Sequence, residues 1–196
     1  MDEYVKNNQY DIIDASFNFI NEKNEINFAD KNNVNIRRDN LLELFFSLNW
    51  KWYLWSKAIK RNVFIKSLPP DYNFPIDDVF FAIPMYYYSQ NYLSLNDKPL
   101  YNYYIDIGAW SSICNKKKID LKKFISICKA RQMEFKYNLS FLIKVNQADV
   151  YERMLMYQCD FQSLFMNLIQ IEDFKEREIA FYELQKYMKL QLMVNI

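Results

Sequence analysis

The sequence contains no histidine and only one glycine among its 196 residues. Without histidine, the Ser-His-Asp and Cys-His arrangements of nucleophilic catalysis are excluded. A general base in this chain must therefore be Asp, Glu, Lys, Tyr or Cys. With Gly108 as its only glycine, the chain also has no glycine-rich loop of the kind that cradles phosphate groups.

Cysteines and long apolar runs are also scarce. Cys114, Cys128 and Cys159 are too widely spaced for a structural zinc site, and we expect them to be free thiols buried in helices. The longest apolar run, from Val79 to Tyr88, is far shorter than the about 20 residues that a membrane-spanning helix needs. We therefore predict no metal site and no transmembrane segment.

The charge of the chain is nearly balanced, with 25 basic and 24 acidic residues and a net charge of +1. A chain this close to neutrality has no strong field to attract nucleic acid, so we expect no nucleic-acid partner. The polar, acidic start at Met1–Glu3 differs from a secretory signal. We expect a cytoplasmic protein, with peripheral attachment to the inner membrane as an open alternative.

Apolar residues make up 51% of the chain and aromatic residues 18%, which is enough for a packed core. β-Branched and aromatic residues predict strands over residues 10–20, 25–29 and 92–105, with a polar loop at 30–35. Apolar spacing predicts a short helix over residues 38–47. A second helix is expected to begin at Asp77 or Asp78 and to contain Pro84.

The composition changes after Ser112, where only helical patterns follow. Asp120 is a candidate N-cap, and three helices are predicted in a tail over residues 113–196. Lys116–Lys118 precede the first of them and are typical of a solvated loop, although they could also contact anionic lipid headgroups. The chain thus divides into a mixed region, residues 1–112, and a helical appendage.

Three motifs follow one another in the first region: Trp55–Arg61 (WSKAIKR), Asp77–Phe81 (DDVFF) and Leu95–Tyr104 (LNDKPLYNYY). In their order and spacing they resemble the acceptor-side half of family-2 glycosyltransferases of bacterial surface-polysaccharide pathways. Residues 1–20 are similar to the segment that follows the metal-binding acidic motif of that family. The resemblance covers residues 1–112 and does not extend into the tail.

The resemblance implies a helix-rich α/β fold with a partial GT-A-like (nucleotide-diphospho-sugar transferase) mixed sheet and a C-terminal helical appendage. It also implies transfer of a sugar from a nucleotide-sugar donor to a glycan or lipid-linked acceptor. We expect the donor-binding half of the family, with its DxD metal site, to be missing from this chain. We therefore expect no cofactor in this chain. Mg or Mn is expected only with the donor-binding half, and a partner chain is one source of that half.

The resemblance assigns the general base to Asp78, with Asp77 in support. The base takes the proton from the acceptor hydroxyl, so it must be ionised, and a helix N-terminus favours the ionised form. The alternative is that both carboxylates only stabilise the first helical turn, where acidic residues are common.

The resemblance also indicates substrate-binding roles for Trp52, Trp55 and Lys57. The tryptophans, with Trp50, could form an apolar platform under a sugar ring, and Lys57 could face a phosphate or an acceptor hydroxyl. Core packing of the tryptophans and a solvated charge at Lys57 remain alternatives. A second reading of the whole chain also remains open: a non-enzymatic interaction module, or inactive remnant, that pairs with another chain through the surface left by the missing half.

Overall fold

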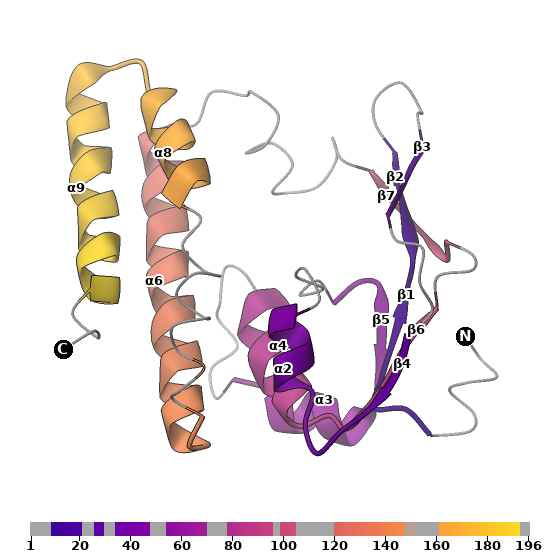
Figure 1. Ribbon diagram of the computed structural model, residues 1–196. Helices are drawn as coiled ribbons and strands as arrows, with labels where there is room; N and C mark the ends of the chain where they lie inside the picture. Colours follow the sequence, from indigo (N-terminus) through magenta and orange to yellow (C-terminus); the bar gives the residue numbers. More distant parts are fainter. Residues whose placement is uncertain are drawn as a thin grey trace. The chain divides into compact units, whose positions relative to one another are not determined.

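The computed structural model describes residues 9–20, 26–29, 34–47, 54–69, 78–95, 99–104, 120–147, 150 and 161–192. Its elements are those of a mixed α/β protein, with sheets in the first part of the chain and helices in both parts (Figure 1). The chain divides into two compact units, residues 1–111 and residues 112–196. Each unit is described separately below.

Unit 1 contains a four-stranded mixed sheet with the strand order β4-β6-β1-β5. Its strands are β1 (Ile12–Ala15), β4 (Val34–Arg37), β5 (Lys57–Ile59) and β6 (Asn91–Leu95). β1 runs parallel to β6 and antiparallel to β5, whereas β4 pairs antiparallel with β6. Every residue of β1 is buried, as expected for a central strand that is covered on both faces.

A three-stranded sheet with the order β3-β2-β7 continues from the first. It consists of β2 (Phe17–Ile20), β3 (Ile26–Ala29) and β7 (Tyr101–Tyr104), with β2 parallel to β7. Ser16 joins the two sheets: its N–H donates to the Leu95 carbonyl and its own carbonyl accepts from the Leu100 N–H, both at 2.9 Å. The single predicted strand over residues 10–20 is therefore two strands that meet at Ser16, with β1 paired to β6 and β2 paired to β7.

Three helices of unit 1 are described: α2 (Leu42–Ser47), α3 (Arg61–Ser67) and α4 (Asp78–Tyr87). Both α2 and α3 pack against α4. The described part of α4 begins at Asp78, in agreement with the prediction, and it continues through Pro84. α2 begins later than predicted, because the Asn40 side chain accepts a hydrogen bond from the Leu42 N–H at 3.1 Å and caps the helix there.

Two strands and one helix of this unit were not predicted. β4 includes Val34 and Asn35, which we expected to lie in a polar loop, and β5 and α3 lie on a stretch that showed no clear periodicity. β4 and β5 form by pairing with β6 and β1, which are distant in sequence. β4 carries the alternating β-branched residues Val34 and Ile36, whereas the three residues of β5 show no such alternation.

Unit 2 consists of helices in its described residues, namely α6 (Leu121–Lys144), α8 (Phe161–Ile169) and α9 (Phe174–Leu192). The three predicted tail helices are thus confirmed. The Asp120 side chain accepts from the Lys123 N–H at 2.7 Å, which confirms the predicted N-cap of α6. α9 packs against both α6 and α8, and their common core contains Phe124, Ile127, Cys128, Leu164, Leu168, Ile171, Ala180, Leu184 and Tyr187.

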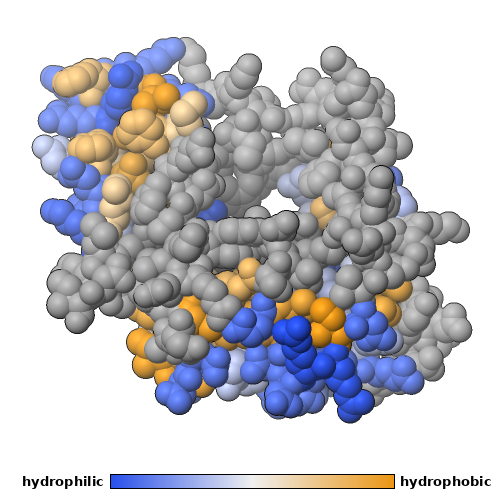
Figure 2. All heavy atoms as spheres, in the orientation of Figure 1, coloured by the Kyte–Doolittle hydropathy of each residue, from blue (hydrophilic) through white to orange (hydrophobic). Residues whose placement is uncertain are grey.

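Hydrophobic side chains also remain on the surface of this unit, and they gather over α8 in Figure 2. Phe165 and Met166 of α8 are half-exposed, and Phe174 at the start of α9 is 75% exposed. Among the described residues, no helix combines the length and the apolar character needed to cross a membrane.

Candidate functional site

A buried carboxylate lies at the centre of the four-stranded sheet. Asp14 on β1 is 2% exposed, although its strand neighbours Ile12, Ile13 and Ala15 are apolar. Its Oδ1 accepts a hydrogen bond from Ser56 Oγ at 2.6 Å, and its Oδ2 accepts one from the Tyr92 hydroxyl at 2.9 Å. Both neighbouring strands thus contribute to the site, because Tyr92 belongs to β6 and Ser56 directly precedes β5.

The charge of Asp14 is balanced by Lys57. The Lys57 ammonium lies 3.5 Å from Asp14 Oδ2 and 3.4 Å from Ser56 Oγ, and its side chain is fully buried. Removing two charges from water costs several kcal/mol, which only close pairing and further hydrogen bonds can offset. That requirement is met by a group of four residues, which we call the Asp14 network: Asp14, Ser56, Lys57 and Tyr92. The network joins β1, β5 and β6.

Tyr92 supports the same network as a permanent donor. Burial, followed by the negative charge of Asp14, raises the pKa of the Tyr92 phenol well above its usual range. The phenol therefore stays protonated and donates a hydrogen bond to Asp14 at all physiological pH values.

A second lysine–carboxylate pair, Lys60 with Asp11, lies next to the same strands, because Asp11 directly precedes β1 and Lys60 directly follows β5. Lys60 Nζ lies 3.4 Å from Asp11 Oδ1, but the Lys60 side chain is 32% exposed. Asp11 Oδ2 also accepts hydrogen bonds from the N–H groups of Gln90 and Asn91. The two pairs have nearly equal distances and differ chiefly in exposure.

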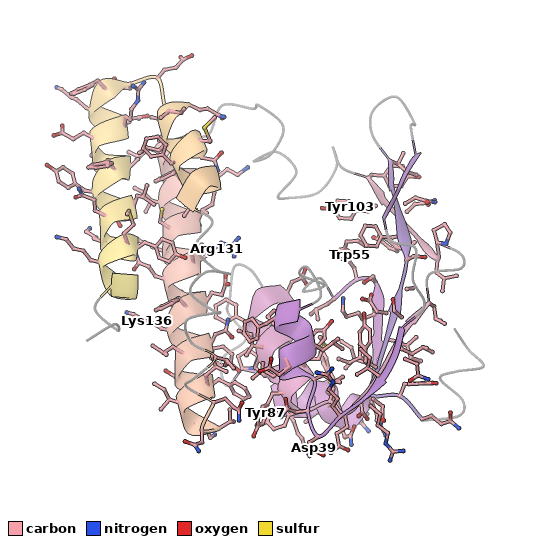
Figure 3. The ribbon with its side chains drawn as sticks, viewed as in Figure 1. Asp39, Trp55, Tyr87, Tyr103, Arg131 and Lys136 are labelled. Carbon is pink, nitrogen blue, oxygen red and sulfur yellow. The ribbon has the colours of Figure 1, made fainter. Side chains whose placement is uncertain are left out.

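An aromatic layer covers one face of the three-stranded sheet. Trp55 stacks on Tyr103, with ring centroids 4.8 Å apart and an interplanar angle of 20°. It also lies 4.9 Å from the Tyr101 ring and meets Phe17 edge-on at 4.5 Å. Figure 3 shows Trp55 and Tyr103 beside each other on this sheet. Trp55 and Tyr103 are half-buried and Tyr101 is 44% exposed, so the layer reaches the surface.

Asp78, the predicted general base, lies in the first turn of α4 and is half-buried. The backbone N–H groups at a helix start favour a negative charge at this position. Two further predicted site residues, Asp77 and Trp52, lie outside the described residues. Of the remaining predicted site residues, Lys57 belongs to the Asp14 network and Trp55 to the aromatic layer, and only Ser56 separates them in the chain.

Three members of the Asp14 network were missed from the sequence: Asp14, Ser56 and Tyr92. A signal for Asp14 was present, because a single carboxylate within the apolar strand sequence Ile12–Ala15 needs a buried partner. Nothing local indicated which residues would supply it. Among the parts of the chain that the structure describes, no group of His, Cys, Asp and Glu side chains could hold a metal ion.

Comparison with protein-family models gives no match for this sequence, and comparison with curated proteins gives none either.

Proposed function

We propose that unit 1 is the acceptor-side half of a family-2-like glycosyltransferase, which positions a glycan or lipid-linked acceptor for transfer from a nucleotide sugar. The chain would work with a donor-binding half supplied by a partner chain or a longer reading frame. A partial GT-A-like sheet belongs to the same proposal. The observation that carries it is the pairing of Trp55 with Lys57 on one short segment fixed by the Asp14 network.

The geometry of that segment supports a binding role for Trp55. Ser56 and Lys57 are both held by the buried Asp14 carboxylate, so the preceding residue, Trp55, has little freedom to move. A binding site gains affinity when its contact residues are fixed in advance. Trp55, Tyr101 and Tyr103 together offer an aromatic surface on which the apolar face of a sugar ring can pack.

Lys57 supports the proposed site in a different way from the one its motif suggested. Its ammonium is engaged with Asp14, so we propose that Lys57 holds the segment in place and leaves direct acceptor contact to Trp55. Asp78 remains the proposed base. Asp77 is proposed to support it, and Trp52 to extend the aromatic surface.

Catalysis is tested by Asp78→Asn in the enzyme reconstituted with its donor-binding half, together with Mg or Mn. The substitution keeps the size of the side chain and removes the proton acceptor, so transfer should fall by about 10²–10⁴-fold. Sugar transfer is the assay, and circular dichroism verifies folding. Asp77→Asn is the matched control and should cost less, since adjacent helix side chains point about 100° apart. Equal activity of Asp78→Asn and wild type would refute the assignment.

Acceptor binding is tested separately with the chain alone. Saturation-transfer NMR with candidate oligosaccharides should show contacts that Trp55→Leu abolishes and Trp55→Phe largely keeps, because Phe retains an aromatic face. Phe64→Leu, a change at an exposed ring on α3, is the control and should leave binding intact. Micromolar binding of UDP-sugars by the chain alone would contradict the assignment of donor binding to the other half.

A further inference from the structure

The exposed face of α6 carries lysines and no carboxylate. Lys122, Lys129 and Lys136 follow one another at seven-residue spacing, Lys144 continues the line, and all four are exposed. At 100° per residue, these side chains fall within an arc of about 80°, and the line is about 33 Å long. We call this line the lysine stripe; Figure 3 labels Lys136 on it.

The lysines of the stripe are not neutralised by the residues of unit 2 that the structure describes. Glu134 is the only acidic residue of α6; it is buried on another side of the helix and bonded to Arg131 at 2.8 Å. None of the four lysines forms an ion pair with any residue that the structure describes. The near-neutral net charge of the chain therefore conceals a local concentration of positive charge.

Apolar side chains lie among these lysines. Met133 is 43% exposed and Ile143 is 59% exposed, and both lie on the same side of α6 as the stripe. The opposite side of α6 supplies Phe124, Ile127 and Cys128 to the core of the unit. α6 therefore cannot expose its main apolar face without losing the core of the unit. The stripe must act while α6 stays packed in that core.

A cavity of about 420 Å³ lies at the N-terminal end of the stripe. Its described lining consists of Leu121, Lys122, Ile125, Ser126 and Lys129. The two ammonium groups and the Ser126 hydroxyl are all possible donors to a phosphate group, and the two aliphatic side chains suit the apolar part of the same molecule. The cavity thus combines the chemistry of a phosphate site with that of an apolar site.

We infer that the lysine stripe docks unit 2 onto an anionic phospholipid surface, with one lipid headgroup in the cavity between Lys122 and Lys129. A straight line of lysines suits a flat layer of phosphate groups, and Met133 and Ile143 gain from contact with the headgroup boundary. Exposed aliphatic side chains among the cations favour a lipid surface over nucleic acid, whose phosphates offer them no apolar contact.

Vesicle co-sedimentation with the full chain tests this inference. The protein should bind vesicles of equal parts phosphatidylcholine and phosphatidylglycerol, should bind vesicles of phosphatidylcholine alone far more weakly, and should be released by high salt. The triple variant Lys122→Gln, Lys129→Gln, Lys136→Gln should bind the anionic vesicles about a hundredfold more weakly, since each lysine near such a surface contributes about a factor of five.

The matched control is the triple variant Lys66→Gln, Lys175→Gln, Lys189→Gln. It removes the same charge from exposed helical positions off the stripe and should bind like wild type. Glutamine is a good helix former, and circular dichroism checks that both variants fold. Three results would each overturn the inference. They are equal weakening in both variants, binding to neutral vesicles as tight as to anionic ones, and binding of single-stranded RNA tighter than of anionic vesicles. None of these results depends on glycosyl transfer.

Discussion

The two units differ in how far apart in sequence their polar contacts lie. In unit 1, the Asp14–Tyr92 hydrogen bond joins residues 78 positions apart, and the Ser56–Asp14 bond joins residues 42 positions apart. In unit 2, the Arg131–Glu134 contact spans three positions within one helix. Polar contacts between distant residues therefore join the strands of the first unit, whereas the second unit consists of helices with local polar contacts and a shared apolar core.

Each unit has its own spectroscopic signal, which allows the comparison to be tested. All four tryptophans lie within residues 1–111, whereas most of the helical residues described belong to unit 2. Tryptophan fluorescence in urea therefore follows unit 1, and far-ultraviolet circular dichroism is dominated by unit 2. The first two predictions below use these two signals.

The largest effect is expected for Lys57→Met. The substitution leaves Asp14 buried without its cation, which should lower the free energy of unfolding of unit 1 by about 3–5 kcal/mol. The fluorescence transition should move to lower urea. Lys60→Met is the matched control, because its pair has a similar distance at a partly exposed site, and it should cost about 1 kcal/mol or less. Equal losses in the two variants would mean that burial does not distinguish the pairs.

A gain in stability is expected for Asn138→Leu in unit 2. Asn138 is fully buried in α6, and neither its side-chain oxygen nor its nitrogen finds a hydrogen-bond partner in the described structure. A buried amide without partners costs about 1–3 kcal/mol, so the leucine variant should unfold at higher urea by circular dichroism. A loss of stability would indicate that the amide has a partner in solution.

A loss of about 1 kcal/mol is expected for Asp120→Ala. The Asp120 side chain accepts from the Lys123 N–H, and removing an N-cap acceptor typically costs this amount. Hydrogen exchange of the first amides of α6 should accelerate more than exchange in α9. Asp120→Asn, which keeps an acceptor oxygen, should recover most of the loss; failure to do so would assign the effect to charge.

An effect of similar size concerns the pH dependence of unit 2. Burial, followed by the charge of Glu183, raises the pKa of the Cys128 thiol to about 12. The unfolded thiol ionises from about pH 9, but the folded thiol stays protonated, so stability falls as the pH rises through that range. Between pH 8 and pH 10, wild type should lose about 1 kcal/mol more than Cys128→Ala. Parallel pH profiles would show that Cys128 is accessible to solvent.

The difference between the units also explains what could be predicted from the sequence. The tail helices and the Asp120 cap follow from patterns within a few residues, and the structure confirms them. The division of a strand at Ser16 and the existence of β4 and β5 do not, because each depends on partners far away in the chain.

The same contrast holds within the candidate site. The motif at Trp55–Arg61 indicated Trp55 and Lys57 as site residues. In the structure Trp55 belongs to the aromatic layer and Lys57 to the Asp14 network. The partners of Lys57 were missed, since Asp14 and Tyr92 come from two other strands.

The pairing of β1 with β6 has a consequence during synthesis of the chain. β1 leaves the ribosome before its parallel neighbour β6, which follows only after about eighty further residues. Until then, the nascent chain has an uncovered strand edge and an unfinished pocket around Asp14, and both favour association with other chains. A ribosome that stalls before Asn91 should therefore hold a chain that chaperones recognise, and unit 1 should close only after β6 and then β7 have been released.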